Sequence, residues 1–123
     1  MKRQILIKAG AIAAKAEIDN SKTADAIWKA LLIKGIANLW GDEIYFEIPV
    51  SLKLENGKEL VLSGDLGYWP NGSCFCIFFG PTPMSKGDEI HPASAVNVFG
   101  RIIGDPKIFK QVKEGTSITI ERA

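Results

Sequence analysis

The feature that most constrains the fold is an apolar run from Cys74 to Phe79, with Gly72 before it and Gly80 after it. A short apolar run between glycines is typical of a β-strand that is buried on both faces. We therefore expect residues 74–79 to form a strand in the interior of the domain.

The segment that surrounds this strand, residues 65–83, is rich in aromatic residues, glycine and proline. Large aromatic side chains near loops with a restricted backbone are frequent in recognition surfaces. Trp69 precedes Pro70, which restricts the backbone of the tryptophan and favours a rigidly held indole ring. This ring is expected either to form part of a binding surface or to cover the end of the core.

Two β-hairpins are predicted. Residues 3–8 and 12–18 alternate between apolar and polar side chains on either side of Gly10. Residues 50–54 and 58–62 alternate in the same way around Asn56-Gly57, whose residues both tolerate a positive φ and are favoured in two-residue hairpin turns.

Two helices are predicted. Apolar residues recur at helical spacing from Ala24 to Leu32, after the capping candidates of residues 19–21, and Gly35 is expected to end this helix. Asp105 and Pro106 predict the start of a second, short helix.

Three further strands complete the chain, at residues 42–50, 96–102 and 117–122, while residues 80–95 are expected to be irregular. Ile44 and Phe46 in the first of these strands should face the core. About eight strands and two helices in a single domain of residues 1–123 predict a mainly β fold, a closed or nearly closed barrel with helices at its ends. A mixed open sheet is the alternative.

The charge of the chain is nearly balanced, with 15 basic and 14 acidic residues. This balance disfavours binding to nucleic acids or to anionic membranes. Lys8 and Lys15 interrupt the apolar start before a signal sequence can form, and no run approaches the roughly 20 apolar residues of a membrane helix. We expect a cytoplasmic protein.

Cys74 and Cys76 are two positions apart, so on a strand both side chains lie on one face, in a geometry unsuited to a disulfide. Reduced, packed thiols are expected. Two cysteines and one histidine fall short of the four ligands of a structural zinc site, and no glycine-rich phosphate loop occurs. We therefore expect neither a metal nor a cofactor.

Three passages resemble cyclophilins, the barrel-shaped peptidyl-prolyl isomerases, in the same order along the chain. Residues 21–31, SKTADAIWKAL, resemble the first cyclophilin helix, and residues 71–77, NGSCFCI, resemble the strand that reads NGSQFFI. Residues 98–102, VFGRI, resemble the strand that reads VFGKV.

The chain is more similar to a small prokaryotic cyclophilin-like family of unknown function. The similarity lies in WGDEIYFEIPV, GDLGYWPNG, CIFFGPTPMS and HPASAVNVFG, which together span most of the chain. It implies a cyclophilin-like barrel and does not imply an activity.

The resemblance to cyclophilins weakens at the catalytic residues. Phe46 takes the place of the arginine that stabilises the twisted prolyl bond, and Cys74 and Cys76 replace a glutamine and a phenylalanine. His91 falls roughly where cyclophilins have a tryptophan. Arg101 would supply a replacement charge only if it pointed into the cleft, and arginines on strands are mostly exposed. We therefore expect no efficient isomerase activity.

The leading hypothesis is a binding domain for a small molecule or an extended peptide. Tyr45 is expected to share a strand face with Glu47, toward either the cleft or solvent, and His91 to be either a ligand contact or an ordinary loop histidine. The candidate ligand-binding residues are Tyr45, Phe46, Trp69, Cys76, Phe78, Thr82, His91 and Asn97. The alternatives are a prolyl isomerase with a relocated cationic donor and, from fold-level resemblance to barrels of oxoprolinase and allophanate hydrolase assemblies, an interaction subunit of a multi-chain enzyme.

Overall fold

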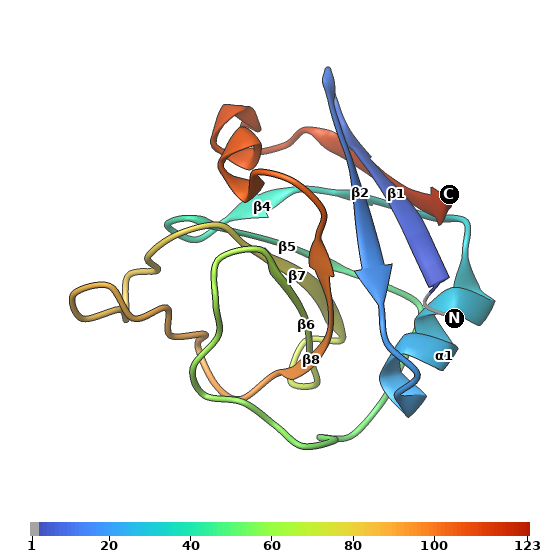
Figure 1. Cartoon of the computed structure of the whole chain (residues 1–123), viewed down its shortest axis with the longest axis horizontal. Coiled ribbons are helices and arrows are strands. Elements are labelled where there is room, and N and C mark those ends of the chain that lie inside the picture. Colours follow the sequence, from blue (N-terminus) through green and yellow to red (C-terminus); the bar gives the residue numbers. More distant parts are fainter. Residues whose placement is uncertain (1–2) are drawn as a thin grey trace.

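The computed structural model describes residues 3–123, and Met1 and Lys2 lie outside the described residues. One sheet of nine strands forms a nearly closed barrel, in the order β3-β9-β1-β2-β8-β6-β7-β5-β4 (Figure 1). The strands are β1 (Arg3–Ala9), β2 (Ile12–Ile18), β3 (Ile33–Ile36), β4 (Asn38–Leu39), β5 (Glu43–Glu47), β6 (Asp65–Trp69), β7 (Cys74–Phe78), β8 (Asn97–Ile102) and β9 (Ser117–Arg122). The helices are α1 (Lys22–Ala30) and the 3₁₀-helix η1 (Pro106–Gln111).

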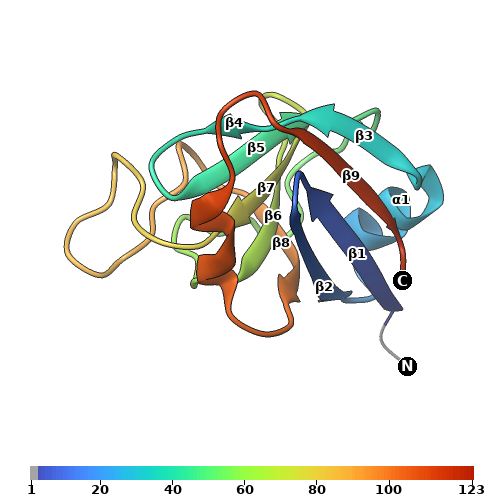
Figure 2. The same cartoon turned by 90° about the horizontal axis from the view of Figure 1, so that it is seen from above.

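The two ends of this sheet meet because they are consecutive in the chain. β3 and β4 are the first and last strands of the order, and Ala37 alone separates them. Figure 2 shows β3 continuing into β4 along one side of the barrel. The predicted mainly β barrel is therefore confirmed, and all the strand pairs in it are antiparallel.

β7 is buried on both faces, as the apolar run predicts. Phe75 and Ile77 point into the main core inside the barrel, where Phe75 stacks on Phe46 with ring centroids 5.2 Å apart. Cys74, Cys76 and Phe78 point outward into a second, smaller apolar cluster. This outward cluster positions the candidate site.

The predicted hairpin around Asn56-Gly57 is wrong. Asn56 has the expected positive φ of 52°, yet residues 50–64 pair with the distant segment 90–96 through bridges from Lys58 to Val96 and from Val61 to Ile90. Long-range polar contacts hold the segment: the Glu55 backbone N–H donates to Asn97 Oδ1 at 2.6 Å, and the Glu55 carboxylate accepts from the start of α1. These contacts outweigh the local turn preference, so the segment covers the outer face of the barrel.

The first helix is shorter than predicted. Ser21 caps it by accepting from the Ala24 N–H, as expected, but the helix ends at Ala30. Ile33–Ile36 form β3 instead, because pairing with β9 places Ile33 opposite Ile120 and buries it. Gly35 therefore lies within a strand.

Two other strands, β4 and β6, were not predicted, since β4 has only two residues and the glycine and proline around Tyr68 and Trp69 suggested a turn. At the C-terminal end, Asp105 accepts from the Lys107 N–H and starts η1, as predicted. Phe109 of η1 is fully buried beside Phe79. Within the described residues, no helix combines the length and apolar character needed to span a membrane.

Candidate functional site

A pocket of about 240 Å³ opens on the outer face of β5, β7 and β6. It borders the outward cluster of Cys74, Cys76 and Phe78, over which Val61, Ile90 and Val96 pack from the covering segments. The lining residues are Trp40, Glu43, Tyr45, Trp69, Pro92, Ala93 and Val96.

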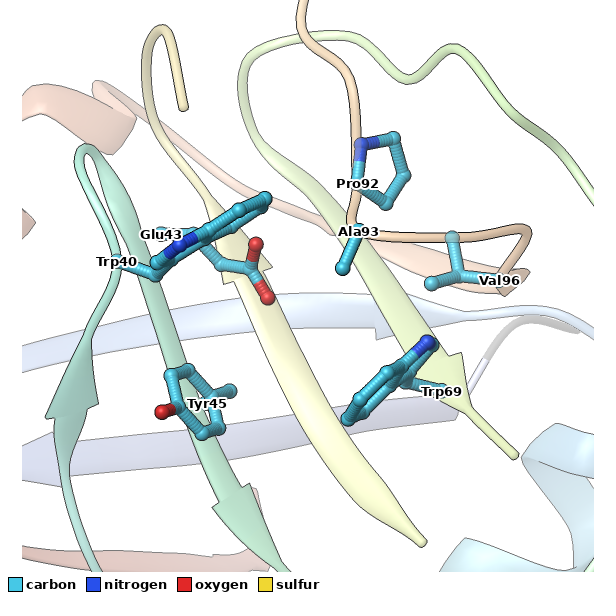
Figure 3. A pocket seen from close by; sticks show the side chains of 7 residues that line it. All are labelled: Trp40, Glu43, Tyr45, Trp69, Pro92, Ala93 and Val96. Atoms are coloured by element: carbon cyan, nitrogen blue, oxygen red, sulfur yellow. The ribbon is translucent and has the colours of Figure 1, made fainter. Parts of the chain in front are cut away.

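Three aromatic rings from separate segments form the walls of the pocket (Figure 3). Trp40 lies in the turn between β4 and β5, and its backbone N–H donates to the backbone carbonyl of Glu43 at 2.9 Å. Tyr45 projects from β5, and Trp69 projects from β6 on the other side. Pro92, Ala93 and Val96 complete the wall from the segment before β8.

The indole of Trp69 is fixed from two directions. Its Nε1–H donates to Ser94 Oγ at 2.6 Å. On the other side it lies against Gly72, where an added Cβ would stand only 2.9 Å from Cζ3 of the ring. The ring is therefore a preformed wall, consistent with the rigid tryptophan expected before Pro70.

Glu43 is the one carboxylate among the lining residues that the structure describes, and its carboxyl group points into the space among the aromatic rings (Figure 3). It is only 6% exposed, and it lies on β5 directly opposite the buried Phe78 of β7. No described residue hydrogen-bonds its Oε1. Burial raises the pKa of Glu43 from 4.5 to about 7, against a smaller lowering by a hydrogen bond from Cys76.

The two thiols of the outward cluster both have raised pKa values. Burial, followed by the neighbouring charge of Glu43, raises the pKa of Cys76 well above its ordinary value, and burial raises that of Cys74. A thiol with a raised pKa carries little thiolate near neutral pH, and the thiolate is the reactive form. Both cysteines are free, as expected, and they pack as small apolar groups.

The structure brings four of the eight candidate residues together. Tyr45 and Trp69 line the pocket, while Cys76 and Phe78 are buried in the cluster that it borders. Glu47, which shares the face of Tyr45, is exposed beyond the pocket.

The other four candidate residues lie elsewhere. Phe46 faces the main core, because alternation along β5 sends it to the side opposite Tyr45. Asn97 is buried and holds the covering segment, donating to Lys53 O and Thr23 Oγ1. The hydroxyl of Thr82 donates to the His91 carbonyl within the 80–95 loop, and Nε2 of His91 lies 3.1 Å from Oε2 of Glu89. None of these residues lines the pocket.

The remaining lining residues were missed, and a signal existed for only one of them. Glu43 is two positions before Tyr45, so strand alternation places it on the same face. The carboxylate is buried because residues 90–96 pack over it. No local sequence pattern predicts that contact. Trp40 reaches the site through the short turn between β4 and β5, whereas Pro92, Ala93 and Val96 are brought there by the long-range pairing of residues 58–61 with residues 90–96.

Arg101 is exposed and donates to Ser63 O at 3.3 Å, and it does not line the pocket. No lysine, arginine or histidine is among the lining residues that the structure describes. Within residues 3–123, no group of three or more His, Cys, Asp or Glu side chains is placed to hold a metal ion.

Comparison with known proteins agrees with the architecture. The chain is 41% identical to the hypothetical protein AF2241 from Archaeoglobus fulgidus, whose solution structure matches with a TM-score of 0.84 over 99% of this chain and 95% of that one. It also matches the structure of McbB in complex with tryptophan, with a TM-score of 0.74 and 12% identity over 96% of this chain and 44% of McbB. At that identity the likeness to McbB shows the fold alone.

No curated protein matches the chain. The model of the family described as cyclophilin-like matches residues 3–121, nearly all of the sequence. The chain therefore belongs to the cyclophilin-like family.

Proposed function

We propose that this chain is a binding domain for a small molecule, which occupies the pocket between Trp40 and Trp69, and that it has no efficient prolyl isomerase activity. The observation that carries the proposal is the buried Glu43 carboxyl group, whose Oε1 lacks a hydrogen-bond partner among the described residues. Leaving such an atom unsatisfied costs about 1–3 kcal/mol. Perturbed, unsatisfied groups in apolar pockets concentrate at functional sites, where a ligand supplies the missing partner.

The size of the pocket favours a small occupant. Its volume of about 240 Å³ is below the roughly 300–1,000 Å³ of sites that hold drug-sized ligands. A pocket of this size suits a compact molecule of one or two rings, or a single side chain of a peptide. We favour the small molecule because it can fill a pocket of this volume by itself, whereas an extended peptide would place no more than one side chain there.

The absence of a cationic donor at the pocket supports the second half of the proposal. Acceleration of prolyl rotation requires a donor aimed at the imide, and a fixed guanidinium supplies it most effectively. Phe46 lies in the core and Arg101 is engaged with Ser63 outside the pocket. When Glu43 is ionised, it would place negative charge where a twisted imide needs a hydrogen-bond donor.

The proposal is tested by screening ¹⁵N-labelled protein against small aromatic compounds and mapping the amide shift changes. Tryptophan belongs in the screen, because McbB, part of which shares this fold, was solved in complex with it. Shift changes are expected around Glu43, Tyr45 and Trp69. They should disappear in Ala93→Phe, which fills the pocket from its exposed rim.

The matched control is Ala13→Phe, the same substitution at an exposed alanine of β2 that does not line the pocket. It should leave the shift changes intact. Binding that maps to another surface, or that survives Ala93→Phe, would contradict the proposal.

A further inference from the structure

We infer that the ligand of this pocket is a small organic ammonium ion that keeps at least one N–H bond and carries an apolar or aromatic body. The inference rests on the proposed function and adds the chemical class of the ligand. It follows from three features of the pocket: its charge, its aromatic walls and its unsatisfied acceptor.

The charge of the site has one sign. Among the described residues that line the pocket, Glu43 alone is charged, and its carboxyl group lies among the lining side chains (Figure 3). A carboxylate in an apolar, largely desolvated site interacts strongly with an opposite charge, because water screens the pair weakly there. An anionic ligand would instead face an ionised acid with no lining cation to offset it.

The walls favour the same sign. Trp40, Tyr45 and Trp69 surround the carboxyl group, and the faces of aromatic rings carry negative electrostatic potential. A cation held within about 6 Å of such rings is stabilised, most strongly by tryptophan and when it is desolvated. Rings around a carboxylate therefore form a cage for a cation and leave room for an apolar body.

The unsatisfied oxygen selects among cations. Oε1 of Glu43 is an acceptor without a donor among the described residues. An ammonium that retains an N–H supplies the missing donor, whereas a quaternary ammonium does not. Charge-assisted hydrogen bonds of this kind are about twice as strong as neutral ones.

A neutral carbonyl ligand is the competing reading, since a protonated Glu43 would donate to it. The pKa of about 7 allows both protonation states near neutral pH. The titratable groups near Glu43 among the described residues are Cys76 and Cys74 from β7 and Tyr45 from its own strand. The turn after β4 and the segment before β8 contribute Trp40, Pro92, Ala93 and Val96, which do not titrate.

The pH dependence of the affinity distinguishes an ammonium ligand from a carbonyl ligand. An alkylammonium remains protonated through the neutral range and requires the ionised acid, so its affinity should rise with pH. The expected increase is roughly 30-fold between about pH 5.5 and about pH 8, since a carboxyl with a pKa of about 7 passes from mostly protonated to mostly ionised. The affinity of a carbonyl ligand would fall over the same interval.

The experiment compares 2-phenylethylammonium with its neutral isostere 2-phenylethanol by calorimetry and by tryptophan fluorescence at both pH values. The fluorescence is measured in a Trp28→Phe background, because Trp28 lies on α1 against Arg122 and would report no binding. Glu43→Gln removes the charge and keeps the shape. Glu47→Gln is the matched control, the same change on the same strand face outside the pocket.

The inference expects the ammonium to bind at least about tenfold more tightly than the alcohol at the higher pH, as a charged hydrogen bond predicts. This preference and its pH dependence should be lost in Glu43→Gln and kept in Glu47→Gln. Equal binding of the two compounds, unaffected by Glu43→Gln but blocked by Ala93→Phe, would overturn the inference and leave the proposed function standing. Binding of neither compound at millimolar concentration overturns the inference, and the broader screen then decides on the proposed function.

Discussion

The carboxyl group of Glu43 on β5 and the thiol of Cys76 on β7 interact, and each shifts the pKa of the other. The thiol stabilises the ionised acid and so lowers the pKa of Glu43, against the larger effect of burial. The acid in turn helps to hold the thiol protonated. The pair keeps one proton on sulfur and leaves the titration near neutral pH to the carboxyl group.

Removal of this donor should raise the pKa of Glu43 further. In Cys76→Ala the carboxylate loses the one side chain among the described residues that lowers its pKa, so the pKa should exceed its value of about 7. Side-chain ¹³C chemical shifts followed against pH measure the change. Cys74→Ala is the control, since Cys74 is not among the groups that shift the pKa of Glu43, and an unchanged or lower pKa in Cys76→Ala would contradict the assignment.

The buried acid should also make the fold less stable at high pH. Its folded pKa of about 7 exceeds the ordinary 4.5, so the folded state binds more protons than the unfolded state between these values. The free energy of unfolding therefore falls as pH rises from about 4.5 to about 7 and this contribution stays lost above that, by up to roughly 3 kcal/mol at 1.36 kcal/mol for each pKa unit.

Urea unfolding of the wild type and Glu43→Gln across this range measures the effect. The neutral amide does not titrate, so the variant should lose this part of the pH dependence and gain stability relative to wild type as pH rises. Glu47→Gln should follow the wild type. Parallel profiles for Glu43→Gln and wild type would show that Glu43 titrates normally.

Glu55 should have the opposite pH dependence. Hydrogen bonds from the Thr23 side chain and from the Thr23 and Lys22 N–H groups lower its pKa, so its stabilising effect is present above about pH 4.5 and is lost in acid. Because Glu55 satisfies free N–H groups at the start of α1, Glu55→Ala should cost about 1–2 kcal/mol at neutral pH, as loss of a helix cap does. The same substitution should cost less in acid, and a cost independent of pH would contradict this role. Glu59→Ala, at an exposed position of the same covering segment, is the control.

The barrel was predictable where a strand carries its own periodic signal. β1, β2, β5, β8 and β9 alternate clearly, and β7 is a continuous apolar run, so their apolar faces alone identify them. The prediction of a hairpin at Asn56-Gly57 was wrong because a turn propensity is local, whereas Asn97 binds this segment at a separation of 42 residues. β3 was predicted as part of the helix because its apolar residues continue the helical spacing of α1, and only pairing with β9 decides between the two structures.

The site was predictable only in part, for the same reason. Tyr45 and Trp69 are conspicuous aromatic residues of short segments, and the sequence indicates both. Glu43 looks like an ordinary surface acid until the chain around Pro92 and Val96 covers it. The burial of a charge is a property of the tertiary structure, and it is the burial that gives Glu43 its unusual pKa.

Finally, the protein should not accelerate cis-to-trans isomerisation of a proline-containing peptide. The position that resembles the cyclophilin arginine is Phe46, which is 1% exposed and stacks on Phe75 in the core, so no rotamer change brings it to a substrate. Arg101, the candidate replacement, contacts Ser63 on an exposed face, and Arg101→Ala should leave the isomerisation rate at the uncatalysed level of the wild type.

An isomerisation assay with a cyclophilin as positive control checks the wild type and Arg101→Ala. A rate above background that is lost in Arg101→Ala would identify a relocated donor, whereas a rate lost in Ala93→Phe would place isomerase chemistry in the aromatic pocket. Either result would contradict the proposal that this barrel binds without isomerising.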